Sequence, residues 1–280
     1  NFAVTPEGDV LWRGVLTAKI LSTPVGADPF SPQVRLLGDL GPAPARERAR
    51  RRVEAWLAAE AGRALRDLRR LRQAVESGAL KGLPRGVAFR LIEAGGLIDR
   101  RDVERDLHAL SQVERRTLKT FAIRIGVHSV WLPGLMKPRA RHFAQAFVSG
   151  PLFPAAPGLT TAPTEPPSPR VLSAHGLRHV ARFLIPVEAL ETMAERRAAP
   201  DPTQEGRKGR LSHGDLAGLG WTAAEAAQII GALKTERARR PDKPGQPLRP
   251  PKDSPFAALA ALNTPAPSRR RRPRKRATQA

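Results

Sequence analysis

Residues 45–75, ARERARRRVEAWLAAEAGRALRDLRRLRQAV, decide the fold class of this 280-residue chain. Apolar residues recur here at every third or fourth position, which is the period of one face of an α-helix. A stripe of this length predicts a long helical segment with one buried face. The stripe consists of Val53, Trp56, Leu57, Leu65, Leu68, Leu71 and Val75.

The opposite face of the same run is rich in arginine, and two interpretations of it stay open. Ten arginines lie between Arg46 and Arg72, together with four acidic residues. In the first interpretation they form a solvated helix face with ion pairs between residues three or four apart. In the second interpretation the arginines contact phosphate groups.

Shorter elements are expected on both sides of this segment. Residues 1–44 are typical of short β-strands and turns, with Pro6-Glu7-Gly8-Asp9 as a hairpin turn. A helix from Gly86 to Ala94 should end at Gly95-Gly96, because glycine adopts left-handed backbone angles at little cost. Further helices are expected over 102–110, from the capping-box pattern Ser111-Gln112-Val113-Glu114, and over 138–148, with a β-like run over 123–132.

The C-terminal half changes in composition. Residues 150–170 contain seven prolines and read as a linker. One helix is expected within Leu177–Arg197, broken or begun near Pro186, and two helices are expected within Leu211–Leu233 around Gly218-Leu219-Gly220. Residues 241–280 contain nine prolines, and seven of the eight residues from Arg269 to Arg276 are basic, which predicts a disordered tail.

These elements predict a mainly α protein: a helical accessory domain with a small β element, a second small helical unit and a disordered basic tail. The expected boundaries are 1–44, 45–150, 151–170, 171–240 and 241–280. The expected core residues are Val53, Trp56, Leu57, Leu65, Leu68, Val87, Leu91, Leu107 and Leu118.

The charge of the chain indicates its class of partner. Lys plus Arg is 48 and Asp plus Glu is 26, which gives a formal charge of +22. A polyanion is the default partner, and nucleic acid is the commonest one, because each neutralised phosphate releases a counterion. The alternative source of the charge is the base composition of the gene.

Several classes of protein are disfavoured by what the sequence lacks. Without cysteine there is no disulfide or thiolate zinc site, which fits a reducing compartment. No run approaches the roughly 18 apolar residues of a membrane-spanning helix. The N-terminus, Asn1-Phe2-Ala3-Val4, lacks both an initiator Met and a signal core, and we interpret it as the cut edge of a longer protein.

No catalytic residue, metal or cofactor is expected within these residues. A phosphate-binding loop needs Gly-Lys followed by Ser or Thr, and the chain has no Gly-Lys dipeptide. His175 and His179 are four apart, but Gly176 stands where a zinc hydrolase would carry Glu, and no third ligand is evident.

The strongest nucleic-acid signal surrounds the β-like run. A single strand is held with its backbone on cations and its bases on aromatic rings. If residues 123–132 form one β-strand, Arg124 and His128 share a face of it. Trp131 would then offer a stacking surface or, alternatively, be part of the core. The candidates in this region are Arg124, His128, Trp131, Lys137, Arg139 and Arg141.

Other features give weaker signals. Arg85 precedes an expected helix start, where free backbone N–H groups favour a phosphate, and Arg90 lies on the same segment. Leu211–Leu233 has helix-turn-helix proportions, although packing without DNA reading is the commoner use of such a pair. The basic tail would bind any polyanion without sequence preference.

Several stretches, in this order, resemble one family. The chain is similar to the C-terminal region of "suppressor of var" (mitochondrial-type) DExH-box superfamily 2 RNA helicases, and most of all to their bacterial branch. The matching stretches are Asp9-Val10-Leu11-Trp12-Arg13-Gly14, residues 84–93 with Gly96 and Arg100, residues 116–118, Ile123-Arg124-Ile125-Gly126, residues 132–138, and Asp253-Ser254-Pro255-Phe256.

This resemblance implies an accessory region that guides a single strand of RNA, or alternatively DNA, during unwinding. The RecA-like lobes that bind ATP and magnesium would precede residue 1, and residues 45–150 would guide the strand. Expected partners are the single strand, those lobes and an RNA-degrading nuclease, with no membrane, in the bacterial cytoplasm. The rival interpretations are a stand-alone nucleic-acid-binding regulator and an adaptor that docks an RNA-processing partner.

Overall fold

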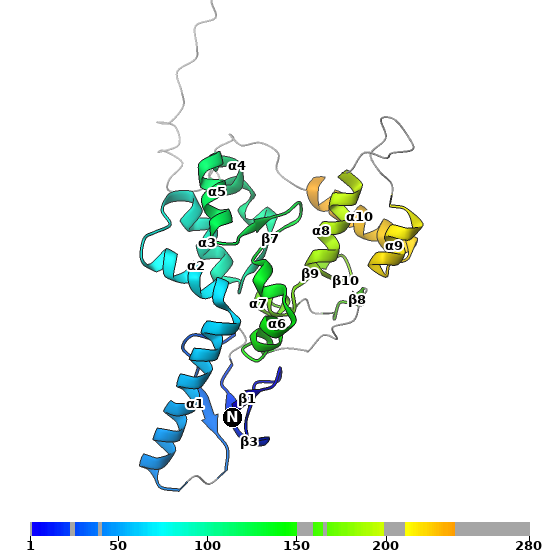
Figure 1. Ribbon diagram of the computed structural model, residues 1–280. Coiled ribbons are helices and arrows are strands. Elements are labelled where there is room, and N and C mark those ends of the chain that lie inside the picture. Colours follow the sequence, from blue (N-terminus) through cyan, green and yellow to red (C-terminus); the bar gives the residue numbers. More distant parts are fainter. Residues whose placement is uncertain are drawn as a thin grey trace, which may run out of the picture. The chain divides into compact units, whose positions relative to one another are not determined.

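The computed structural model describes residues 2–22, 26–38, 41–149, 159–164, 167–198 and 211–238. Helices predominate in this part of the chain, so the expectation of a mainly α protein is confirmed (Figure 1). The described residues up to Lys234 belong to one compact unit. None of the described helices is long and apolar enough to cross a membrane.

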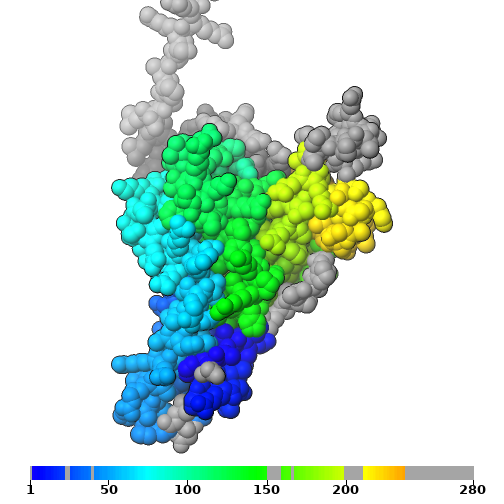
Figure 2. Space-filling model, in the orientation of Figure 1, coloured from blue at the N-terminus to red at the C-terminus, as the bar shows by residue number. Residues whose placement is uncertain are grey.

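The N-terminal residues form the expected β segment. Four antiparallel strands pair in the order β1-β2-β3-β4, and Val10 and Ala18 are fully buried between neighbouring elements. The sheet packs against the first long helix (Figure 2). At this contact the ring centres of Phe2 and Trp56 lie 5.2 Å apart. The strands are β1 Phe2–Val4, β2 Asp9–Trp12, β3 Val15–Ile20 and β4 Val34–Leu36.

Residues 45–75, with their apolar stripe, fold within two helices, α1 (Ala43–Ala64) and α2 (Arg66–Glu76), which meet at Leu65. Leu65 leaves helical geometry, with φ −107° and ψ 37°, but its side chain stays in the core. The predicted stripe is buried apart from Trp56, which is half-buried. On the other face, Glu47 pairs with Arg50 and Arg51, as the first interpretation of the arginines expects.

The middle of the chain folds as short elements around α3. Helix α3 begins at Gly82, one turn earlier than expected. It ends before Gly95 and Gly96, whose φ angles are +80° and +102°. A Cβ on Gly96 would collide with the Leu135 side chain, so this reversal requires glycine. The elements are α3 Gly82–Glu93, β5 Leu97–Asp99, the 3-10 helix η1 Arg100–Val103, α4 Glu104–Ala109 and α5 Gln112–Thr120.

The β-like run over 123–132 is a hairpin, and the expectation of one strand is wrong. The turn closes where the Gly126 amide donates to the Ser129 carbonyl (2.8 Å). The three short strands of this sheet lie in the order β5-β7-β6. The elements here are β6 Arg124–Ile125, β7 Ser129–Trp131, the 3-10 helix η2 Pro133–Met136 and α6 Pro138–Gln145.

Within this compact unit, we call the elements from β8 to α10 the second unit, after the second small helical unit that the sequence predicts, and it contains strands as well as helices. The helix expected within Leu177–Arg197 begins directly after Pro186, one of the two possibilities that the sequence left open there. Residues 177–186 form a hairpin that was not predicted, and it also pairs with β8, in the order β8-β10-β9. The helix pair within Leu211–Leu233 is confirmed, with Gly220 ending the first helix in the left-handed conformation. Its elements are β8 Thr160–Thr161, α7 Pro169–His175, β9 Leu177–Val180, β10 Phe183–Pro186, α8 Val187–Ala198, α9 His213–Leu219 and α10 Ala223–Ala238.

All nine expected core residues are described, and eight of them are buried. Trp56 is the exception noted above. The expected linker over 151–170 lies partly outside the described residues, and the expected tail over 241–280 lies wholly outside them.

The cap of α5 gives a direct test of the local structure. The Ser111 hydroxyl accepts from the Glu114 amide (3.3 Å), and the Glu114 carboxylate accepts from the Ser111 amide (2.8 Å). We expect Ser111→Ala to lower the free energy of unfolding by about 1 kcal/mol, measured by urea denaturation. Thr120→Ala, at the other end of the helix, should cost less than about 0.5 kcal/mol. Equal losses in the two variants would contradict the capping role.

Candidate nucleic-acid interface

The hairpin formed by β6 and β7 places the first two candidates against each other. Arg124 pairs with Trp131 across the strands, and its guanidinium lies 5.7 Å from the centre of the indole ring. Trp131 is only 4% exposed. Its ring therefore cannot stack on a nucleobase without leaving the core, which corrects the expected stacking role. Arg124 itself is exposed, with Glu195 at 3.9 Å.

His128 lies in the hairpin turn, not on a common strand face with Arg124. Its backbone carbonyl accepts from the Arg178 guanidinium (2.8 Å) and from the Arg100 amide (3.0 Å). Burial, followed by the positive charge of Arg178, lowers the pKa of His128 to about 4. The imidazole is therefore neutral at pH 7 and contributes no cation for a phosphate.

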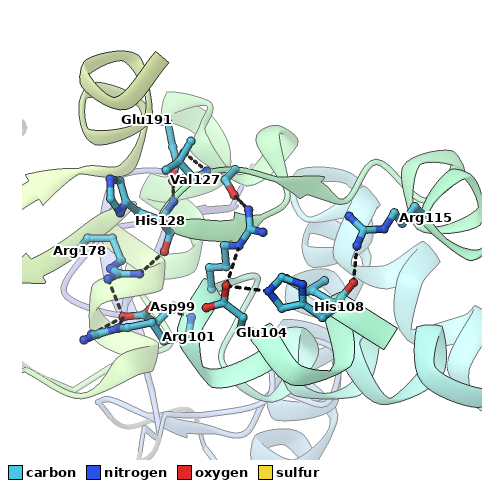
Figure 3. Close-up of polar contacts among 12 residues, drawn as sticks. Asp99, Arg101, Glu104, His108, Arg115, Val127, His128, Arg178 and Glu191 are labelled. Carbon is cyan, nitrogen blue, oxygen red and sulfur yellow. Dashed lines mark hydrogen bonds and ion pairs between the residues drawn. The ribbon is translucent and has the colours of Figure 1, made fainter. Parts of the chain in front are cut away.

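A cluster of charged side chains holds the second unit to this turn (Figure 3). We call Asp99, Arg101, His128, Arg178 and Glu191 the junction cluster. Arg178 from β9 is 6% exposed and donates to the Asp99 carboxylate at 2.6 Å. Burial alone would raise the pKa of Asp99, but the Arg101 hydrogen bond and the charges of Arg178 and Arg101 lower it below its ordinary value.

The other half of the junction cluster is a carboxylate on α8. Glu191 is 4% exposed and accepts from the amides of Val127 (2.6 Å) and His128 (2.9 Å). A Cβ on Gly126 would collide with this carboxylate and with the Trp131 ring. Gly126 is thus required by the close approach of α8 to the turn.

The remaining five candidates are two arginines on α3, two arginines on α6, and Lys137, which directly precedes α6. Arg90 is committed to the Asp102 carbonyl (2.7 Å) and to Asp106 (3.4 Å). Arg139 pairs with Glu60 at 2.5 Å although its side chain is 75% exposed. Arg141 is half-buried on α6. Arg85 and Lys137 are exposed; Arg85 lies inside the first turns of α3, which corrects its expected place before the helix start.

A basic hollow on α5 was not singled out from the sequence. It is lined by Gln112, Arg115, Arg116 and Lys119. Arg115 is bound to the backbone, with its guanidinium donating to the Leu107 carbonyl (2.5 Å). Arg116 and Lys119 are exposed. Their spacing of three on a capped helix was the signal that could have identified them.

Among the sequence candidates and the residues of the hollow on α5, four exposed cations are thus available to a ligand. We call Arg85, Arg116, Lys119 and Lys137 the free cations, because their side chains form no hydrogen bond or ion pair with another described residue. The structure therefore divides the basic residues into those that stabilise the fold and those that remain available to a polyanion.

One face of the helix pair α9–α10 is buried against the rest of the second unit. Trp221, Ala226 and Ile229 are buried in a second apolar cluster with residues of β9, β10 and α8. Thr222 and Glu225, two of the few polar side chains that could read bases, bond to each other in the helix cap. The packing interpretation of this pair is the one supported.

Comparisons of the chain with protein-family models, with curated proteins and with solved structures give no match. The functional argument therefore depends on the chain's own residues.

Removing the Glu191 carboxylate should loosen the junction cluster. Glu191→Leu leaves the amides of Val127 and His128 without their acceptor, and we expect a loss of about 1–3 kcal/mol in the free energy of unfolding. Glu188→Leu, at an exposed position of the same helix, is the matched control for urea denaturation. A loss no larger than that of the control would disprove the bridging role of Glu191.

Acidification should destabilise the protein through His128. The pKa of the folded state, about 4, lies below the ordinary value of 6.5, so the unfolded chain binds the proton first as pH falls from 6.5 to 4. One pKa unit corresponds to about 1.4 kcal/mol, which sets an upper limit of about 3 kcal/mol on this loss. His128→Gln should flatten the fall of Tm between pH 6.5 and 4, whereas His213→Gln should leave it unchanged.

Proposed function

We propose that this chain binds a single strand of RNA or DNA as the accessory region of an ATP-dependent superfamily 2 helicase. ATP and magnesium would act on motor lobes outside these 280 residues. The accessory region would hold the strand as it leaves the motor. RNA processing in the bacterial cytoplasm, with a nuclease as a further partner, is part of the same proposal.

The observation that carries the proposal is the set of free cations. Some arginines of the basic surface serve the fold through ion pairs, as Arg50 and Arg51 do with Glu47. The free cations have no such partner among the described residues. Phosphates bind to exposed cations with release of counterions, so these side chains supply affinity without sequence preference.

The junction cluster supports the same function in a different way. Its arginine and carboxylates connect β9 and α8 to the turn between β6 and β7. A region that guides a moving nucleic-acid strand needs cations whose positions stay fixed relative to one another while the strand moves. Buried, hydrogen-bonded charge pairs provide such fixed geometry.

The binding experiment uses two matched sets of variants. Arg85→Ala and Lys137→Ala each remove a free cation, whereas Arg51→Ala removes an equal charge that is paired with Glu47. Affinity for a 12-nucleotide single strand should fall steeply between about 50 and 200 mM salt. Each of the first two variants should lower the magnitude of the log–log salt slope by about 0.7, and Arg51→Ala should not.

Binding that is absent in the full chain, or independent of salt, would falsify the proposal. Equal slopes in all three variants would show that total charge, and not the free cations, determines affinity. Circular dichroism of each variant separates loss of binding from loss of fold.

A further inference from the structure

A largely apolar cavity opens beside α3. Its volume is about 360 Å³, which lies in the range of small-ligand sites. Helices α2, α3, α6 and α7 and the loop over 27–30 supply its walls. Three aromatic rings line it, those of Phe30, Phe89 and Phe147.

The cavity also contains a hydrogen-bonding group without a partner. Ser173 lines it and is 3% exposed, and its hydroxyl has no hydrogen-bond partner among the described residues. An unpaired buried hydroxyl costs free energy, so a ligand with a polar edge would be stabilised there. A purely aliphatic ligand would leave the hydroxyl unsatisfied.

The mouth of the cavity bears an exposed aromatic ring on a basic helix. Phe89 is 51% exposed although it lines the cavity. Arg85, one of the free cations, is four residues earlier on α3 and therefore on the same helix face. An aromatic ring next to an unpaired arginine is the arrangement that holds a base and its phosphate.

We infer that one nucleobase of the bound strand leaves the stack and enters this cavity, against Phe89 and toward Ser173, with a neighbouring phosphate at Arg85. This inference rests on the proposed function. The wall also carries Asp28, Glu76 and Glu93, and Arg72 pairs with the first two. Carboxylates accept hydrogen bonds and do not donate them. They therefore favour adenine, whose amino group lies on an edge without a carbonyl oxygen, over uracil or thymine, whose N–H lies between two carbonyl oxygens.

The test places 2-aminopurine at one position of a 12-nucleotide single strand and titrates it with the full chain. Its fluorescence should change on binding, and the change should be lost in Phe89→Ala. Phe89→Ala should also weaken binding roughly tenfold, since stacking of one base on an aromatic ring contributes that much. Leu83→Ala is the matched control, because Leu83 is exposed on the same helix but does not line the cavity.

A second measurement does not depend on the stability of the Phe89 variant. A strand with a single abasic nucleotide, moved along its length, should bind the unaltered protein more weakly at one register than at the others. Ser173→Ala should reduce the loss caused by the abasic nucleotide at that register, because the base no longer supplies a partner to the buried hydroxyl. Salt-dependent binding with no effect of the abasic nucleotide or of Phe89→Ala overturns the cavity inference and leaves the proposed function standing. Absence of any binding overturns both.

Discussion

The attachment of the second unit to the turn between β6 and β7 depends on the Glu191 carboxylate. This carboxylate accepts hydrogen bonds from two backbone amides of the turn. A buried carboxylate is costly unless hydrogen bonds replace its water. Here the amides of Val127 and His128 do so, and Arg178 binds the same turn through the His128 carbonyl. Because removing either partner leaves an unsatisfied buried group, the turn and the second unit are stabilised together.

This arrangement explains why a charge of +22 alone cannot identify the binding residues. Arg178 is structural, and Arg124 covers the Trp131 ring. Arg90 and Arg139 bind carbonyl or carboxylate groups of the chain itself. Arginine suits these positions because its guanidinium offers several donors in a fixed plane. The free cations are distinguished by their lack of such partners, which only the fold shows.

The sequence predicted what depends on local pattern and missed what depends on distant partners. The stripe in α1 and α2, the cap at Ser111 and the end of α9 at Gly220 all carry their own local signals. The hairpin of β9 and β10 was missed because its turn has Ala181 at φ +53°, where glycine or asparagine would have given the signal. The role of Trp131 stayed open between stacking surface and core because alternation along a β-strand does not say which face is buried.

The candidate binding residues follow the same division. Arg85 could be proposed from its position near a helix start, but Phe89 gave no signal, since a phenylalanine on a helix is usually part of the core. Val87, Ala88 and Leu91 fix the inner face of α3 in the core, which leaves Arg85 and Phe89 on a rigid outer face. The packed helix fixes the backbone of both residues, so only their side chains lose conformational freedom when a ligand binds. If a phosphate of a nucleic-acid strand binds to Arg85, the Phe89 ring lies one helical turn away on the same face of α3.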